Sequence, residues 1–325
     1  MATASATQRR AAELNVLARK QRSLWQDAAY RLFRNKAAVA GLIVIAAAFL
    51  VAIFADISVG DFHFSIAPYS PTLIPQPPAS QMEPLWTGSK YTDPRYLLGT
   101  DFLGRDILSR LIYASRISMV VGFVPTAIVF ALGVTVGLVA GFFGGWIDQL
   151  LMRFTDVIYA FPDFLFLIII VASFRTSAFG KIMDGLLLIF VAIAIVGWVG
   201  VARLTRGQVL SLKEREFVEA ARSVGATPVR LMWKHLLPNA LAPLIVTAAF
   251  AVPGAILGEA TLSFLGVGII PPTASWGGMI NEGFPLFGTN PWAVLMPALC
   301  ISIVMLAFTF VGDGLRDALD PRMKT

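Results

Sequence analysis

Residues 37–55, AAVAGLIVIAAAFLVAIFA, form a run of nineteen residues without a charge. As an α-helix this run would be about 28 Å long, which matches the hydrocarbon core of a bilayer. Ten of its residues are Leu, Ile, Val or Phe, and together they favour insertion by about 3–6 kcal/mol. Thirty-six residues precede the run, and it is longer than the apolar part of a signal peptide. We therefore predict an uncleaved membrane-spanning helix.

The composition of the whole chain also indicates a membrane protein. Hydrophobic residues make up 57% of the 325 residues and charged residues 14%, and the mean hydropathy is +0.73. Soluble domains contain about 45–50% apolar and about 25% charged residues. This difference excludes a soluble enzyme. The single cysteine, Cys300, excludes an intramolecular disulfide and a cysteine-based metal site.

Five further runs with almost no charge predict five more spans, so we expect an all-α integral membrane protein with six transmembrane helices. These runs are 117–147, 157–174, 185–202, 236–258 and 283–312. The third of the six spans is the least regular, because Asp163 interrupts it.

The distribution of positive charge predicts the orientation. Nineteen of the twenty-six Lys and Arg residues lie in segments that share one side of the membrane, and five of the other seven lie in the long loop 56–116. Short cytoplasmic loops carry the excess of Lys and Arg, so we expect both termini in the cytoplasm. The net charge of +6 then reflects topology, and we expect no nucleic-acid partner. The four cytoplasmic segments are 1–36, 148–156, 203–235 and 313–325.

Two terminal or loop segments each allow two interpretations. The basic segment 1–36 carries eight Lys and Arg residues, and it either touches anionic membrane lipid or serves as a partner-binding arm. The extracytoplasmic loop 56–116 contains seven prolines, which favour an extended course. It is either a tether or lid on the membrane part, or a docking surface for an external partner.

Three glycines in the second span, Gly133, Gly137 and Gly141, recur every four residues. They therefore share one helix face. Because a bilayer provides no hydrophobic drive between helices, small residues on one face allow a second helix to approach closely. We predict that this face packs against another span.

The cytoplasmic loop 203–235 contains the pattern of a short helix. Ser211 and Glu214 have the spacing of a capping box, which predicts the helix start. Gly225 supplies a residue that can adopt the left-handed conformation at the helix end. Residues at positions i, i+3, i+4 and i+7 form one apolar stripe: Phe217, Ala220, Ala221 and Val224. The charged residues beside the stripe are Glu216, Glu219 and Arg222.

A second short helix is predicted over 229–237, before Pro238. Thr227 is suited to the N-cap and Pro228 to the first helical position. The loop would then be a helix–turn–helix on the cytoplasmic face. Its apolar stripe fits either a partner protein or a position flat on the lipid surface.

The same loop resembles the E-A-A-x3-G-x9-I-x-L-P loop of ATP-binding-cassette importer permeases. Glu219-Ala220-Ala221 is followed by Gly225 at the family's spacing, and nine residues later by the stretch 235–238, HLLP. His235 replaces the Ile of the general pattern, and His-x-Leu-Pro-Asn is similar to the peptide and nickel branch. Three more segments resemble the second permease subunit of that branch: 98–106 (LGTDFLGRD), 259–266 (EATLSFLG) and 312–321 (GDGLRDALDP).

The resemblance implies a type I permease for dipeptides, oligopeptides or a related solute, with one N-terminal helix, 37–55, before a five-helix core, 117–312. It also implies a bacterial or archaeal cytoplasmic (inner) membrane as the location. The partners it implies are a homologous second permease, two cytoplasmic ATPases and an extracytoplasmic solute-binding protein. The residues that would couple to the ATPases are Glu216, Glu219, Ala220, Ala221, Arg222, Gly225 and Pro238.

The chain itself is expected to bind no cofactor and to catalyse no reaction. It contains no G-x-x-x-x-G-K-[ST] loop, so ATP and Mg²⁺ would be bound by the ATPase partners. We expect no metal site in this chain either. The cargo is not determined by the sequence, because closely similar permeases carry peptides, nickel and glycosides.

Glu259 and Ser263 follow the fifth span and precede a stretch rich in Gly and Pro. Such a stretch can re-enter the bilayer only where it lines a cavity. One interpretation is that Glu259 and Ser263 line the outer part of the translocation path. The other is that Glu259 is an acid at the outer interface that stays hydrated.

Two other classes of membrane protein fit less well. A secondary transporter or channel needs ionisable residues within its spans, and the predicted spans contain only Asp163, which we expect near a cytoplasmic end. A carboxylate is tolerated there at a helix N-terminus. An intramembrane hydrolase needs paired acid and base groups, whereas Asp313 is a single acid and H-E-x-x-H is absent from the sequence.

Overall fold

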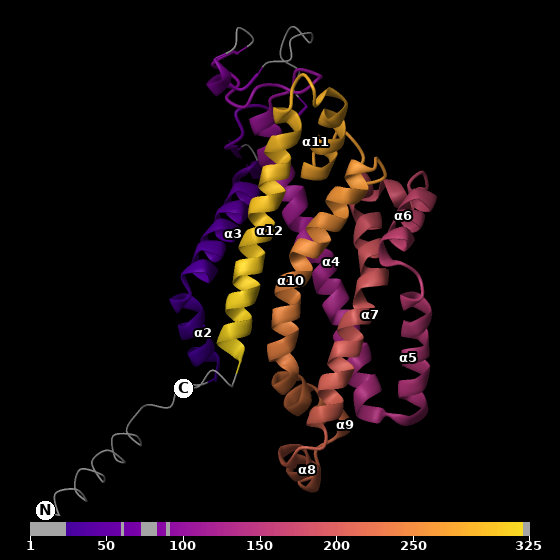
Figure 1. Ribbon diagram of the computed structural model, residues 1–325. Helices are drawn as coiled ribbons and strands as arrows, with labels where there is room; N and C mark the ends of the chain where they lie inside the picture. Colours follow the sequence, from indigo (N-terminus) through magenta and orange to yellow (C-terminus); the bar gives the residue numbers. More distant parts are fainter. Residues whose placement is uncertain (1–23, 60–61, 73–82, 89–91, 321–325) are drawn as a thin grey trace, which may run out of the picture.

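The computed structural model describes residues 24–59, 62–72, 83–88 and 92–320. The described residues form a bundle of long, roughly parallel helices (Figure 1). The helices are α2 (Leu24–Arg34), α3 (Lys36–Phe54), α4 (Ile107–Phe143), α5 (Gly145–Tyr159), α6 (Asp163–Phe174), α7 (Leu186–Leu212), α8 (Glu216–Ser223), α9 (Pro228–Arg230), α10 (Leu237–Phe264), α11 (Trp276–Gly283) and α12 (Trp292–Leu319). Short 3-10 turns are η1 (Leu85–Thr87), η2 (Phe179–Gly185) and η4 (Phe284–Leu286), and η3 (Leu231–Leu236) is a π-helix.

The predicted fold class is confirmed. Among the described residues, five helices are long and apolar enough to cross a membrane, and the bent pair α5 and α6 makes a sixth candidate span. In the described ranges, β-structure is limited to a small antiparallel hairpin of β1 (Ile57–Val59) and β2 (Phe62–Phe64) and an isolated bridge between Thr100 and Asp106. We call the end of the bundle that carries this hairpin the hairpin end, and the opposite end the α8 end (Figure 1).

The described chain begins and ends at the α8 end. Helix α2 packs on α12, and α2 and the C-terminal end of α12 lie at the same end of the bundle as α8 (Figure 1). Both ends of the described chain must lie at the same end of the bundle if the chain crosses the membrane an even number of times.

Helix α4 begins at Ile107, ten residues before the predicted span. The Asp106 carboxylate caps it by accepting a hydrogen bond from the Ser109 amide at 2.8 Å. The predicted boundary at 117 was set by the absence of charge, but Arg110 in the first turn of α4 is buried and ion-paired. A boundary set at the first charged residue therefore excludes helical residues whose charges are buried and paired.

The third span is broken rather than continuous. Helices α5 and α6 meet at an angle of 78°, whereas the sequence predicted one helix over 157–174. Pro162, at the break, has an extended backbone (φ −60°, ψ 120°) and no N–H to continue the helical hydrogen bonds. The two halves lie along α7, so the break lies beside the body of the bundle and not at its end (Figure 1).

The predicted glycine face in α4 packs directly against α7. A Cβ added to Gly133 would lie 2.6 Å from the Cβ atom of Val201, and one added to Gly141 would lie 2.8 Å from that of Val209. Neither distance leaves room for a methyl group. The close approach that the glycine spacing predicted is therefore confirmed, and α7 is the partner.

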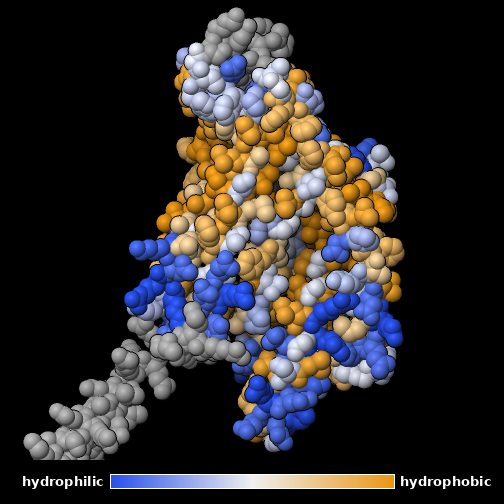
Figure 2. Space-filling model, viewed as in Figure 1, coloured by the Kyte–Doolittle hydropathy of each residue, from blue (hydrophilic) through white to orange (hydrophobic). Residues whose placement is uncertain are grey.

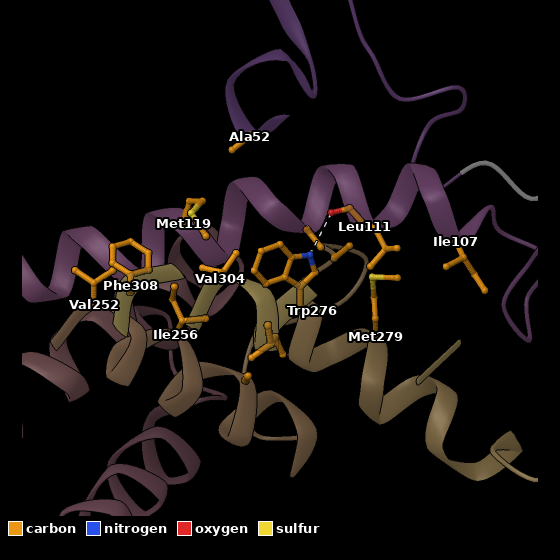
Figure 3. Packing of buried hydrophobic residues seen from close by; sticks show 14 of the residues in the cluster. Ala52, Ile107, Leu111, Met119, Val252, Ile256, Trp276, Met279, Val304 and Phe308 are labelled. Atoms are coloured by element: carbon orange, nitrogen blue, oxygen red, sulfur yellow. Dashed lines mark hydrogen bonds between the residues drawn. The ribbon is translucent and has the colours of Figure 1, made fainter. Parts of the chain in front are cut away.

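The largest apolar cluster joins α3, α4, α10, α11 and α12 near the hairpin end (Figure 3). Trp276 of α11 lies at its centre, is 3% exposed and donates its indole N–H to the Leu111 carbonyl of α4 at 3.2 Å. This hydrogen bond satisfies the polar atom of a buried aromatic ring. It fixes α11 on the first turns of α4.

Candidate functional site

The loop at the α8 end begins differently from the prediction. Helix α7 continues to Leu212 and α8 begins at Glu216, with Arg215 as its N-cap. Ser211 lies in the last turn of α7, where its hydroxyl donates to the Gln208 carbonyl at 3.3 Å. The predicted capping box of Ser211 and Glu214 is therefore wrong, because the packing of buried Val209 keeps the backbone helical through this position.

The end of α8 has the predicted geometry. Gly225 adopts a left-handed backbone with φ +82°, and the Ala226 amide donates to the Ala221 carbonyl at 3.1 Å. This is the hydrogen bond of a Schellman motif. Thr227 then caps α9 by accepting a hydrogen bond from the Arg230 amide at 3.4 Å, with Pro228 as the first helical residue. Both expected turn signals are confirmed.

The second helix of the loop does not stop before the fifth span. Helix α9 passes through the π-helical residues Leu231–Leu236 directly into α10. Pro238 has no N–H, so the carbonyl four residues earlier lacks its usual partner, and the wider π turn accommodates this gap. The side chain of Asn239 donates to the His235 carbonyl at 2.6 Å. Helix α9, the π-helix and α10 thus form one continuous helical stretch, Pro228–Phe264.

Helix α8 is attached to the bundle by one buried residue. Val218 has no exposed surface and packs with residues of α4, α7 and the π-helix: Leu138, Val209, Leu231, Met232 and Leu236. Ala221 is half-buried against the same cluster. Val218 and Ala221 thus connect α8 to α4, α7 and the π-helix.

The predicted apolar stripe largely faces away from the chain. Phe217 is 38% exposed and Val224 is 89% exposed. The charged side chains of Glu216, Glu219 and Arg222 are exposed beside them. Together these residues form a mixed apolar and charged surface, which we call the α8 face. Figure 2 shows that this end of the molecule is mainly hydrophilic, below a broad apolar belt.

A cleft of about 390 Å³ opens between α4, α6, α7 and α10. We call it the central cleft. Its described lining residues are Thr126, Val129, Asp163, Leu167, Ile193, Val196, Gly197, Gly200, Val201, Thr247, Ala251, Gly254, Ala255 and Gly258. Asp163 carries the only formal charge among them.

The walls of the central cleft are made of small residues. A Cβ added to Gly200, Gly254 or Gly258 would meet no atom within 4 Å, so these glycines face open space. Sequence analysis did not identify them. The sequence does contain a pattern that could have identified them. Gly197 and Gly200 are three residues apart and Gly254 and Gly258 are four apart, so each pair lies on one helix face.

Asp163 lies deeper than we expected. The α7 residues that line the cleft with it, from Ile193 to Val201, lie around the middle of a helix that covers Leu186–Leu212. Thr126 and Val129 likewise lie near the middle of α4. The expectation of a position near a cytoplasmic end is therefore wrong: the broken span places Asp163 at mid-depth.

Glu259 and Ser263 lie on a different face of α10. Glu259 has no exposed surface, and its Oε1 accepts a hydrogen bond from the Ser263 hydroxyl at 2.6 Å. The Ser263 Oγ also accepts the Ile269 amide at 3.2 Å. The Glu259 Oε2 has no hydrogen-bond partner among the described residues. Neither side chain lines the central cleft, and a role in the translocation path stays a prediction.

A buried group of charges closes the hairpin end. Asp101 accepts hydrogen bonds from Arg105 at 2.7 Å and from Arg110 at 2.6 Å, and Glu282 of α11 pairs with the same two guanidinium groups. Two positive and two negative charges balance. The group ties the last part of the long loop to α4 and α11, and no sequence pattern indicated that Glu282 takes part.

Family comparison agrees with this architecture. A family model described as "Binding-protein-dependent transport system inner membrane component" matches residues 133–325, and one described as "N-terminal TM domain of oligopeptide transport permease C" matches residues 23–84. The segment between these matches, 85–132, includes about half of the long loop and more than half of α4.

Relatives match over nearly their full length. The chain is 39% identical to the oligopeptide transport system permease protein OppC of Bacillus subtilis, over 97% of this chain and 95% of that protein. It is 40% identical to the dipeptide transport system permease protein DppC of Alkalihalophilus pseudofirmus, over 93% of this chain and 91% of that protein. Among solved structures, an inward-facing MetNI methionine ABC transporter matches with a TM-score of 0.50 and 20% identity, over 66% of this chain and 98% of that chain. The last match indicates a shared fold.

Proposed function

The chain belongs to the family of binding-protein-dependent transport system inner membrane components, and we propose that it is a permease subunit of an ATP-driven importer of oligopeptides or dipeptides. The observation that carries this proposal is the end-to-end match to peptide permeases, which includes both the N-terminal span and the core. The location we propose is the cytoplasmic (inner) membrane of a bacterium, as for these relatives.

The proposed complex contains four kinds of subunit. This chain would pair with a homologous second permease, two ATPases would bind at the α8 end, and a solute-binding protein would dock at the hairpin end. The chain has no nucleotide-binding loop, since its only Gly-Lys pair, Gly180-Lys181, is followed by Ile182. ATP and Mg²⁺ would therefore be bound by the ATPase partners.

Coupling would run through the α8 face. When the ATPases close, they would move α8, and Val218 would transmit this movement to α4, α7 and the π-helix. Because the π-helix continues into α10, the same movement would tilt α10. Helices α4, α7 and α10 are three of the four that line the central cleft. A displacement at the ATPase surface would thus change the width of the cleft.

Glu219 provides a direct test of the coupling surface. Its side chain is exposed on the α8 face, so Glu219→Lys leaves the fold of this chain intact. Reversing a charge at a partly desolvated contact costs up to several kcal/mol. We expect co-purification of the ATPases to fall at least about tenfold, since about 1.4 kcal/mol corresponds to a factor of ten.

Glu214→Lys is the matched control, because Glu214 is exposed nearby but lies outside α8. Wild-type co-purification and wild-type peptide-stimulated ATP hydrolysis in the Glu219→Lys complex would contradict the coupling role. That result would instead favour an amphipathic pair that lies on lipid.

Transport itself is tested in proteoliposomes that contain this permease, its sister permease, the ATPases and the binding protein. We expect uptake of a labelled peptide when ATP is present on the ATPase side, and none with a non-hydrolysable analogue. A secondary transporter would instead carry the peptide without ATP and lose uptake when an ionophore removes the ion gradient. A channel would carry the peptide without ATP whether or not the ionophore is present.

A further inference from the structure

We propose that Asp163 binds the α-ammonium group of the peptide cargo as it passes through the central cleft. This inference rests on the proposed function, because it assumes that the cargo is a peptide. It assigns a role to the one charged residue in the cleft, and it names the end of the peptide that the permease recognises.

The depth of Asp163 is the first argument. Residues from the middle of α4 and α7 line the same cleft, so Asp163 lies level with the middle of these two candidate spans and not at their ends. An ionised side chain at this depth is costly unless it faces water, a partner charge or a ligand. The central cleft provides such a space, since Asp163 is among its lining residues.

The carboxylate is also uncommitted. No hydrogen bond or ion pair links Asp163 to any other residue in the described part of the chain, and its side chain is exposed. The other acids of the same broken span are paired: Asp148 with Arg206 at 2.5 Å and Asp156 with Arg203 at 2.8 Å. Asp163 is therefore the acid of this span that is available to a cation from outside the chain.

The walls of the cleft fit a cargo of variable side chains. Gly200, Gly254 and Gly258 face open space, and the remaining walls are uncharged. Such a surface gives little selection among side chains. All linear peptides share a backbone and an N-terminal amine, whose pKa near 7.7–8.0 keeps it largely protonated at pH 7. The single negative charge in the cleft complements this shared positive group.

A single contact with the ammonium group also suits transport better than a site that binds both ends of the peptide. A site along a conduction path must attract its cargo without holding it. The described lining residues include no Lys or Arg that could bind the peptide carboxylate at the same time. The cleft would therefore orient the peptide by its N-terminus and release it when the helices move.

The test uses the complete reconstituted complex with tri-alanine as the probe. A carbodiimide activates a carboxyl group, and the activated group then forms an amide with an amine and releases a urea; an amine already bound beside the carboxyl group reacts ahead of amines in solution. We expect labelled tri-alanine to become attached to Asp163, as mapped by mass spectrometry, and N-acetylated tri-alanine not to become attached. Attachment only at other acids, or equal labelling after Asp163→Asn, would overturn the proposal.

Uptake gives a second readout. We expect Asp163→Asn to lower tri-alanine uptake about tenfold, whereas Asp156→Asn, which removes a surface acid of the same span, leaves uptake near wild type because exposed ion pairs contribute little. In an Asp163→Cys, Cys300→Ser protein, a sulfonate-bearing methanethiosulfonate should restore uptake, and a trimethylammonium-bearing one should not. Restoration by both reagents would overturn a role for charge.

The remaining outcomes separate this inference from the proposed function. If the wild-type complex carries no peptide, the proposed function is wrong. If the wild type carries peptide and Asp163→Asn carries it equally well, the function stands and the ammonium site is wrong. If Asp163→Asn releases the sister permease from the complex, Asp163 pairs with a cation of that subunit, and the proposal is overturned.

Discussion

The Nη1 atom of Arg110 and the Oε2 atom of Glu282 lie 2.7 Å apart, although 172 residues separate them in the sequence. Arg110 belongs to the first turn of α4 and Glu282 to the last turn of α11. The side chain of Arg110 is 3% exposed. This ion pair therefore fixes α11 to the first turn of α4 at the hairpin end.

Removing one member of this group should destabilise the protein. Arg110→Met leaves Asp101 and Glu282 with Arg105 as their only cation within the group. Breaking a buried ion pair costs about 3–5 kcal/mol, so we expect a clearly lower melting temperature of the purified complex. Arg95→Met is the control, because Arg95 pairs with Asp93 at the surface, and we expect no measurable change. Equal melting temperatures for both variants would contradict a structural role for the buried group.

Glycines in two different surroundings should respond differently to the same change. Gly133→Ala places a methyl group 2.6 Å from the Cβ atom of Val201, so we expect α4 and α7 to separate and the complex to lose stability. Gly254→Ala meets no atom within 4 Å and should be tolerated. The measurement is the yield and melting temperature of each variant. Greater loss with Gly254→Ala would show that the cleft is filled.

The parts of the fold that depend on local patterns were predictable. The first span begins and ends within one residue of its uncharged run. Gly225 and Thr227 turn the chain as their residue types favour. The glycine face in α4 correctly predicted a close helix contact. In each case the decisive interaction lies within a few residues or on one helix face.

The parts that depend on distant residues were not predictable. A proline alone does not signal the break at Pro162, since Pro125 lies inside α4 and both Pro243 and Pro253 lie inside α10. The central cleft needs four helices in place before its walls exist. Asp163 was visible as an unusual residue, but its depth follows from how the broken span lies against α7.

The orientation predicted from the Lys and Arg distribution can be tested by labelling. In a Cys300→Ser background, a thiol at position 83 lies in the long loop and one at position 214 lies beside α8. We expect a membrane-impermeant maleimide to label Glu83→Cys in intact cells and to label Glu214→Cys only after lysis. Labelling of both from outside would contradict the predicted topology.

Glu259→Gln tests the predicted role of Glu259 in the translocation path. The amide oxygen can still accept the Ser263 hydroxyl, so we expect the complex to assemble normally. Glu259 adjoins Gly258, which lines the central cleft, and we expect replacement of its carboxyl group by an amide to change the rate of peptide uptake several-fold. Ser302→Ala is the control, since its hydroxyl bonds only within α12. Unchanged uptake of several peptides would mean that Glu259 only stabilises the end of α10.

Gly225→Val tests whether the direction of α8 matters for coupling. A Cβ at this position would meet no atom within 4 Å, so the change introduces no clash. Its effect comes from the backbone, because φ of +82° is a strained conformation for a β-branched residue and costs about 1–3 kcal/mol. The chain would relieve this strain by changing the turn, and α8 would point elsewhere while the spans stay in place.

We therefore expect Gly225→Val to leave both permeases in the membrane and to reduce peptide-dependent ATP hydrolysis and ATPase co-purification together. Gly225→Asn is the matched control. Asn tolerates the left-handed conformation far better than Val, so this variant adds a side chain of similar size and keeps the turn. Equal loss in both variants would point to the added volume, and wild-type values in both would show that the ATPases do not depend on the direction of α8. If α8 couples the ATPases to transport as a rigid helix, only Gly225→Val should reduce ATP hydrolysis and ATPase co-purification. Only this variant changes the turn that sets the direction of α8.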